Sequence, residues 1–307
     1  MKHLPLIIAM TSSLLSQAAE KKHLTVLGKD MAYIETGTGD PIVFLHGNPT
    51  SSFLWRNIIP YVAHLGRCIA PDLIGMGDSE KISDPKSHTF AENSRYLDAF
   101  YEKLGLKKKI TFVVHDWGSA LAFDWASRHP EAVKGIAFME SITVPYKWEQ
   151  MPPKGKEIFQ ALRSPAGEKM VLEQNSFLEV NLPLSHLIPL TKEEHDEYRR
   201  PFLTPGESRR PMLSWARQLP FYGEPSAFTA VAERYTAWLK KTQVPKLYIE
   251  ADPGMSSPDA KQFCNSLPNA TKIVVKGLHY PQEDSPAEVG TAIAAWLQGI
   301  TPPVKQK

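Results

Sequence analysis

Apolar residues along this chain gather in short continuous runs, and stretches of helical periodicity separate them. Eight runs predict strands, at residues 23–27, 32–36, 42–46, 68–72, 110–114, 134–139, 246–250 and 272–275. From the third onward the runs are continuously apolar rather than alternating, which is the pattern of parallel strands covered on both faces. Helices are predicted at residues 52–64, 91–104, 119–128, 258–266 and 286–298. This alternation predicts an α/β fold with a mostly parallel, eight-stranded sheet and helices on both faces.

The alternation stops between residues 144 and 243, where no run resembles a strand. This stretch contains the Pro152-Pro153 pair, several aromatic residues and helix-like segments at 169–180 and 192–198. We therefore predict a helical cap domain at residues 144–243, inserted into a core domain of residues 20–143 and 244–307. Open α/β sheets bind ligands at the carboxyl ends of their strands, so a cap over those ends would enclose the ligand.

The first 19 residues predict a signal peptide. A short basic start is followed by a mostly apolar stretch from Leu4 to Leu15, and small residues precede a cut after Ala18 or Ala19. The apolar stretch is too short to span a bilayer. We expect export to the periplasm or secretion, or a cytoplasmic protein if the leader is not functional.

Composition narrows the possible partners. The chain has 307 residues, a net charge of +2 and a lysine cluster at 107–109 too short for a nucleic-acid surface. Cys68 and Cys264 are its two cysteines, so no disulfide framework is expected, and Cys68 in an apolar run is predicted to be a buried thiol. No His, Cys, Asp or Glu cluster has metal-ligand spacing. We expect a monomer that uses neither a metal nor a cofactor.

One polar motif, residues 72–79 (DLIGMGDS), contains a G-x-G pattern. The third glycine of a dinucleotide-binding fingerprint is missing, and no strand–helix unit of that kind surrounds the motif. We therefore interpret it as a turn that needs glycine in the left-handed conformation.

The run at 110–114 ends at a sharp turn, His115-Asp116-Trp117-Gly118, and a helix is predicted to follow. Strand, turn and helix are the setting of a nucleophile elbow, where Asp116 takes the place of the usual serine and the second glycine is kept. A carboxylate can displace a leaving group at carbon and form an ester that water later cleaves. Taken alone, Asp116 could equally be an N-cap of the helix.

Residues at other strand ends complete this candidate site. Asn48 follows the third strand and Trp117 follows the nucleophile; both carry side-chain N–H donors for a small anion or a leaving group that gains negative charge. His279 follows the last strand, where a base is expected. The supporting acid is either Glu140, which ends the sixth strand, or Asp252, which follows the seventh. The residues themselves favour neither.

The sequence resembles the haloalkane dehalogenases of the α/β-hydrolase superfamily from about Leu24 to Leu297. The matching stretches are 46–52 (HGNPTSS), 72–79 (DLIGMGDS), 114–118 (VHDWG), 138–140 (FME) and 277–279 (GLH), with 209–211 (RRP) and 213–215 (LSW) in the cap.

The resemblance implies Asp116 as nucleophile, His279 as base, and Asn48 with Trp117 as the halide-binding pair. It favours Glu140 over Asp252 as the acid. It also implies that the enzyme hydrolyses a small haloalkane with water, through a covalent alkyl-aspartyl enzyme, to an alcohol, a halide and a proton.

Two other groups share much of the pattern. Epoxide hydrolases also carry His-Asp-Trp-Gly, usually with an aromatic residue in place of Asn48 and two cap tyrosines that protonate the epoxide. Four tyrosines are available here, but no motif pairs them: Tyr146, Tyr198, Tyr222 and Tyr235. Coelenterazine luciferases keep Asn, Asp-Trp, Glu and His at the matching positions, so the catalytic residues alone leave that oxidative function open.

Overall fold

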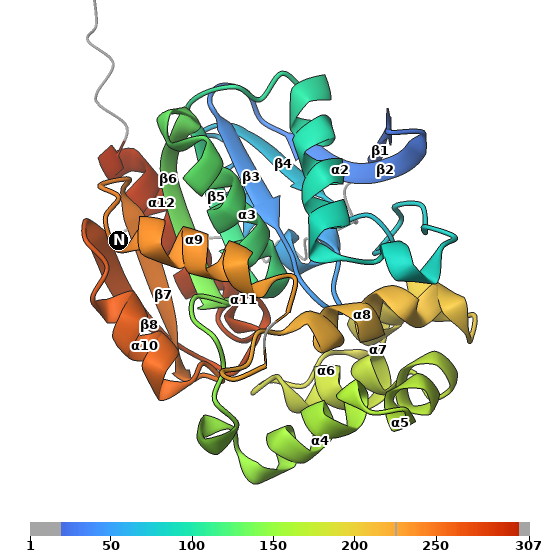
Figure 1. Cartoon of the computed structure of the whole chain (residues 1–307). Helices are drawn as coiled ribbons and strands as arrows, with labels where there is room; N and C mark the ends of the chain where they lie inside the picture. Colours follow the sequence, from blue (N-terminus) through green and yellow to red (C-terminus); the bar gives the residue numbers. More distant parts are fainter. Residues whose placement is uncertain (1–19, 225, 301–307) are drawn as a thin grey trace, which may run out of the picture.

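One mixed sheet of eight strands forms the centre of the molecule (Figure 1). The computed structural model describes residues 20–224 and 226–300, so the predicted leader lies outside the described residues. The sheet order is β1-β2-β4-β3-β5-β6-β7-β8. The strands are β1 (Lys22–Val26), β2 (Lys29–Thr36), β3 (Pro41–Leu45), β4 (Arg67–Pro71), β5 (Ile110–His115), β6 (Val133–Ser141), β7 (Lys246–Pro253) and β8 (Ala270–Gly277).

All strands except β2 run in the same direction. Strand β2 is antiparallel to both β1 and β4, and the remaining neighbours pair in parallel. The eight predicted strands and the mostly parallel sheet are therefore confirmed. In β4, Cys68 is a buried free thiol, as predicted. Central strand β5 is buried along its whole length. Strand β8 differs, because it lies at the sheet edge and is largely exposed; the expectation that it is covered on both faces is wrong.

Helices cover both faces of the sheet. On one face α1 (Ile59–Val62) packs against α12 (Pro286–Ile300). On the other face α3 (Asp116–Arg128) lies between α2 (Phe90–Lys103) and α9 (Thr229–Leu239) (Figure 1). The helices α10 (Pro258–Asn265) and α11 (Pro281–Asp284) follow β7 and β8. Helix α3 begins at Asp116 itself, three residues before the predicted start. The helix predicted at 52–64 is a short 3-10 turn, Ser52–Trp55, followed by α1.

Between β6 and α9 the chain forms a helical layer, residues 142–228, which we call the insertion. Its helices gather at the carboxyl ends of the strands (Figure 1). They are α4 (Pro153–Arg163), α5 (Ala166–Glu168), α6 (Leu182–Leu184), α7 (Lys192–Arg199) and α8 (Arg210–Gln218), with π-helical turns at Lys169–Glu173 and Phe177–Asn181.

Two details of this region differ from a simple reading of its periodicity. The helix predicted at 169–180 is broken in the middle, where Asn175 has a φ of 55°. Helix α9 lies inside the predicted cap range of 144–243, yet it packs against α3 on the face of the sheet. The segment at 192–198 is helical as predicted and starts with a capping box between Thr191 and Glu194.

In the described part of the chain, no helix is long and apolar enough to cross a membrane.

Candidate active site

Asp116 lies at the sharp turn between β5 and α3, where its backbone adopts the left-handed conformation. Its φ is 49°, and such a conformation costs a non-glycine residue roughly 1–3 kcal/mol. The Ser119 hydroxyl donates a hydrogen bond of 2.5 Å to the Asp116 carbonyl. A β-carbon at Gly118 would lie 2.2 Å from the Leu45 carbonyl oxygen, so the turn requires glycine there. The predicted strand, turn and helix are present, with an aspartate at the tip.

The Asp116 carboxylate contacts one backbone donor and one imidazole. The Asn48 N–H donates to Asp116 Oδ1 at 2.9 Å, and His279 Nε2 lies 3.6 Å from Oδ2. Burial by itself would raise the pKa of this carboxyl, but the contacts with His279 and Asn48 outweigh it and lower the pKa. A β-carbon at Gly47 would lie 2.1 Å from Oδ1, so glycine at that position lets the loop after β3 approach the carboxylate.

His279 lies between two carboxylates. Its Nδ1 is 3.4 Å from Glu140 Oε2, on the side of the ring opposite Asp116. Both distances exceed those of strong hydrogen bonds. Burial lowers the pKa of this imidazole, but the hydrogen bonds with Asp116 and Glu140 raise it by more, to about 9. The three predicted catalytic side chains are therefore brought together in the order carboxylate, imidazole, carboxylate.

A second histidine holds the backbone of the first. His115 Nε2 lies 2.7 Å from the His279 carbonyl oxygen, which can only accept, so this ring nitrogen carries the proton. Burial lowers the pKa of His115 to about 3, and the ring is therefore neutral. The two rings are 4.6 Å apart. His115 is thus a packing and hydrogen-bonding residue that holds the backbone of His279, as its place beside the elbow indicates.

Glu140, and not Asp252, lies against the imidazole. Glu140 has a φ of 42° at the end of β6, and its carboxylate accepts hydrogen bonds of 3.1 Å from the Met255 N–H and the Ser256 hydroxyl. A β-carbon at Gly254 would lie 2.9 Å from Glu140 Oε1. Asp252 is exposed and, among the described residues, makes no hydrogen bond with His279. The loop after β7 thus supports the acid from β6 instead of supplying one.

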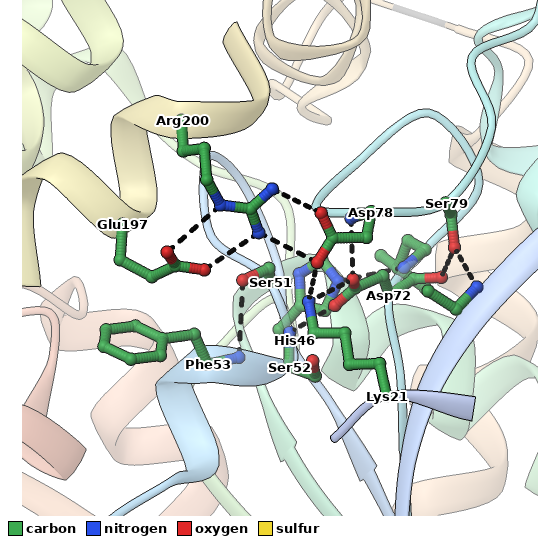
Figure 2. Close-up of polar contacts among 12 residues, drawn as sticks. Lys21, His46, Ser51, Ser52, Phe53, Asp72, Asp78, Ser79, Glu197 and Arg200 are labelled. Carbon is green, nitrogen blue, oxygen red and sulfur yellow. Dashed lines mark hydrogen bonds and ion pairs between the residues drawn. The ribbon is translucent and has the colours of Figure 1, made fainter. Parts of the chain in front are cut away.

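The loop that carries Asn48 is held by the motif at 72–79 (Figure 2). The fully buried Asp72 accepts hydrogen bonds from the Ser52 N–H at 2.7 Å and, through its other oxygen, from the Asp78 N–H at 2.8 Å. His46 Nε2 accepts from the Leu73 N–H at 3.0 Å. These bonds join the turn after β4 to both ends of the loop after β3. The motif is a turn, as predicted, and it supports the loop that brings a donor to Asp116.

The same motif connects the core to the insertion through an ion-pair network (Figure 2). Lys21 Nζ lies 2.6 Å from both Asp72 Oδ2 and Asp78 Oδ2. Arg200, in the insertion, binds both oxygens of Asp78 at 2.6 and 2.9 Å and also pairs with Glu197. The Arg200 and Lys21 contacts lower the pKa of Asp78 far below its usual value. Lys21 and Arg200 were not foreseen, because no motif identifies two cations that are distant in sequence.

Both predicted halide-binding side chains contact helix α8 of the insertion. Asn48 Nδ2 donates to the Met212 carbonyl at 3.1 Å, which fixes the orientation of the amide and leaves its second N–H. The Trp117 ring packs on Trp215 at 4.6 Å and on Phe228 at 5.1 Å. Its indole N–H donates to no acceptor in the described part of the chain. One helix therefore orients both N–H donors.

The site contains no arrangement that would hold a metal. Within residues 20–224 and 226–300, no group of three or more His, Cys, Asp or Glu side chains is placed to bind an ion. Two surface hollows of about 290 and 590 Å³ lie on the insertion, and none of the five predicted site residues lines them. The polar groups that the site brings together are two carboxylates, an imidazole and N–H donors.

Comparison with known proteins places this chain beside a family of hydrolases. A family model described as the alpha/beta hydrolase fold matches residues 40–164. A haloalkane dehalogenase of Sphingobium indicum is 52% identical over 286 residues, which cover 92% of this chain and 97% of that protein. One of Mycolicibacterium smegmatis is 49% identical over 277 residues, which cover 89% of each chain.

Solved structures agree with these sequence matches. The crystal structure of the haloalkane dehalogenase DbeA from Bradyrhizobium elkani has a TM-score of 0.87 at 43% identity and covers 92% of this chain and 98% of that one. The haloalkane dehalogenase DatA from Agrobacterium tumefaciens has the same TM-score of 0.87 at 35% identity, and covers 93% of this chain and 98% of its own. The likeness extends over core and insertion alike, and the chain belongs to the haloalkane dehalogenases of the α/β-hydrolase fold.

Proposed function

We propose that this chain hydrolyses the carbon–halogen bond of small haloalkanes, with Asp116 as the nucleophile. The observation that carries the proposal is the contact of the Asp116 carboxylate with a backbone N–H at 2.9 Å and an imidazole nitrogen at 3.6 Å. That environment keeps the carboxylate ionised and leaves a base beside it for a second step. The identity of 52% to a haloalkane dehalogenase supports the same activity.

In the first step, an Asp116 oxygen attacks the carbon that bears the halogen. A carbon–oxygen bond forms, the carbon–halogen bond breaks, and the halide leaves with the bonding electron pair. The Asn48 amide and the Trp117 indole N–H receive the developing negative charge. Removal of one such donor costs about 3–4 kcal/mol of barrier in comparable sites, so Trp117→Phe should slow halide release by about a hundredfold or more.

In the second step, His279 takes a proton from water, and the water oxygen attacks the Asp116 ester carbonyl. The backbone N–H of Asn48, which donates to Asp116 Oδ1 at 2.9 Å, supports the oxyanion together with that of Trp117. The ester carbon–oxygen bond then breaks to give the alcohol and free Asp116, and His279 loses its proton to solvent. Glu140 orients the imidazole and stabilises its charged form.

The tyrosines argue against epoxide opening. Tyr198 donates its hydroxyl to Glu283 and Tyr235 donates to the Ile142 carbonyl, so both are engaged elsewhere. Tyr222 is 56% exposed. Tyr146 alone is left, and a pair of tyrosines that could protonate an epoxide is not assembled among the described residues.

A bromide-release assay tests the proposal. Purified protein with 1-bromobutane should release bromide over many turnovers, whereas His279→Ala should release about one equivalent per enzyme and keep the alkyl group as added mass on Asp116. Absence of bromide release from folded protein with any simple bromoalkane would refute the function. Light from coelenterazine, or diol from an aryl epoxide, in place of bromide would instead assign the luciferase or the epoxide hydrolase activity.

A further inference from the structure

The histidine loop, residues 278–284, is fastened to the insertion by its own backbone. The His279 N–H donates to the Ser185 carbonyl at 3.1 Å. Next to it, the Tyr280 ring stacks on His186 at 4.6 Å with an angle of 14° between the planes. The insertion segment at 185–188 therefore lies directly against the residue that we propose as the base.

Asp284 joins the same two parts of the chain with both of its oxygens. Oδ1 accepts hydrogen bonds from the Leu187 and Ile188 N–H groups of the insertion, at 2.8 and 2.9 Å. Oδ2 accepts from the N–H of Leu278, the residue before His279, at 2.9 Å. The side chain is buried, with 7% of its surface exposed. A buried carboxylate that accepts three backbone N–H groups holds them in a fixed geometry.

We propose that Asp284 is a positioning residue for the base, one that makes the placement of the His279 imidazole depend on the docking of segment 185–188. Asp284 does not touch the reacting atoms. It fixes the backbone before His279, while the Ser185 carbonyl fixes the N–H of His279 itself. This inference rests on the proposed function, because it needs His279 to act on the alkyl-enzyme.

The arrangement predicts an effect on one half-reaction only. Asp116 is oriented by short hydrogen bonds with the Asn48 N–H and Ser119, neither of which bonds to Asp284, whereas its contact with the His279 imidazole is longer, at 3.6 Å. Loss of Asp284 should therefore leave the attack on the haloalkane nearly unchanged. Hydrolysis of the ester needs a water molecule aligned by the imidazole, and a shift of about 1 Å in such an alignment can cost about a hundredfold in rate.

The experiment measures the two steps separately by rapid quench with 1-bromobutane, as the bromide burst and the decay of alkylated Asp116. Asp284→Asn keeps the size of the side chain but presents an NH2 group to either the insertion or Leu278. We expect it to slow ester hydrolysis about tenfold and to change the burst rate by less than about twofold. Asp284→Ala should slow ester hydrolysis further, so that the alkyl-enzyme accumulates.

The matched control is Arg200→Gln. Arg200 also joins the insertion to the core through a carboxylate, at 2.6 and 2.9 Å from Asp78 (Figure 2). Its hydrogen bonds within the described chain go to Asp78 and Glu197, and none goes to the histidine loop. We expect both steps of this variant to stay within about twofold of wild type.

The inference would be overturned if Asp284→Asn slowed both steps equally or left ester hydrolysis unchanged. It would also be overturned if Arg200→Gln slowed ester hydrolysis as selectively as Asp284→Asn. Asp284→Asn decides the matter if Asp284→Ala does not fold. Failure of the proposed function would look different, because wild-type protein would then release no bromide.

Discussion

At the scale of single residues, the site depends on two carboxylates held in unusual backbone conformations. Asp116 has a φ of 49° and Glu140 a φ of 42°. Asp116 directly follows β5, and Glu140 lies at the end of β6. Each is kept in place by donors from a different loop: Asn48 for the first, and Met255 with Ser256 for the second. Non-glycine residues in this conformation are often found where geometry serves a function.

The charge state of His279 should follow that of Asp116. A pKa raised to about 9 means that the fold stabilises the imidazolium. This stabilisation is complete below the unfolded pKa of about 6.5 and is lost as the pH rises through about 9. Alkylation removes the charge of Asp116, so the pKa of His279 should fall and make the ring a base near neutral pH.

Histidine NMR titration checks this expectation. The His279 signal of the free enzyme, assigned by its absence in His279→Gln, should titrate near 9. In Asp116→Asn it should titrate at a lower pH, because one of the two carboxylate charges is gone. Two results would contradict the pairing of His279 with Asp116. One is a His279 signal that titrates below pH 7 in wild type, and the other is a His279 pKa that Asp116→Asn does not change.

The two candidate acids should differ in their effect on turnover. We expect Glu140→Gln to slow ester hydrolysis by about a hundredfold or more, because the amide no longer stabilises the imidazolium. Asp252→Asn should retain activity within about twofold, since Asp252 is exposed and makes no bond with His279 in the described part of the chain. Single-turnover decay of the alkyl-enzyme measures both. Loss of activity only in Asp252→Asn would mean that the acid has been misassigned.

This choice also marks the limit of what the residues could predict. Asp116 and His279 could be predicted because each directly follows an apolar run, and parallel strands bring their carboxyl ends to one edge. Glu140 and Asp252 share that property, so position alone could not separate them. Which of the two carboxylates lies against His279 depends on the turn at Gly254, because this turn directs the Met255 N–H toward Glu140. A backbone donor of this kind leaves no signature in the sequence.

At the scale of elements, helix α8 contacts both of the proposed halide donors, Asn48 and Trp117. The Met212 carbonyl accepts from Asn48, and Trp215 packs on Trp117 with 35° between the ring planes. Residues 212 and 215 lie one helical turn apart, on the same face. The existence of strands could be predicted from their apolar runs, but this helix–loop contact could not, because its carbonyl acceptor and its ring orientation arise only in the folded chain.

Removal of the Trp215 ring should weaken halide binding. An aromatic pair contributes about 0.5–1.5 kcal/mol, so we expect Trp215→Ala to raise the dissociation constant of bromide by about two- to tenfold, measured by titration calorimetry. Trp148→Ala is the control: Trp148 stacks on Phe221 at 3.7 Å elsewhere in the insertion, and its loss should leave bromide affinity unchanged. Equal effects of the two variants would show that the stack on Trp117 has no special role.

At the scale of the whole molecule, buried polar contacts join the insertion to loops at the carboxyl edge of the sheet. Arg56 follows the 3-10 turn after β3, and its two terminal nitrogens bind the Glu283 carboxylate of the histidine loop at 2.6 and 2.8 Å. One of these nitrogens also binds Glu194 of the insertion at 2.7 Å. The Tyr198 hydroxyl, also from the insertion, donates to Glu283. These contacts couple the positions of the core and the insertion at the site.

The Arg56–Glu283 pair is buried, with side-chain exposures of 7% and 4%. Arg56→Met would leave the Glu283 charge without its partner, a change that costs roughly 3–5 kcal/mol. We expect the melting temperature of Arg56→Met to fall by about 10 °C. In Arg56→Met/Glu283→Gln the buried Glu283 charge is gone as well, and only the more exposed Glu194 carboxylate lacks its arginine. The amide oxygen that replaces the carboxylate can still accept from Tyr198, so more than half of the loss should be recovered.

Thermal unfolding of both variants measures this coupling. The surface control is Arg95→Met, since Arg95 pairs with Glu92 on the exposed surface. The side-chain exposure of Arg95 is 54%, and this control should shift the melting temperature by less than about 2 °C. If the double variant is no more stable than Arg56→Met, the loss comes from the packing of the arginine stem rather than from the uncompensated charge. The insertion would then be held to the histidine loop chiefly by the hydrogen bonds of Asp284, of the His279 N–H and of the Tyr198 hydroxyl.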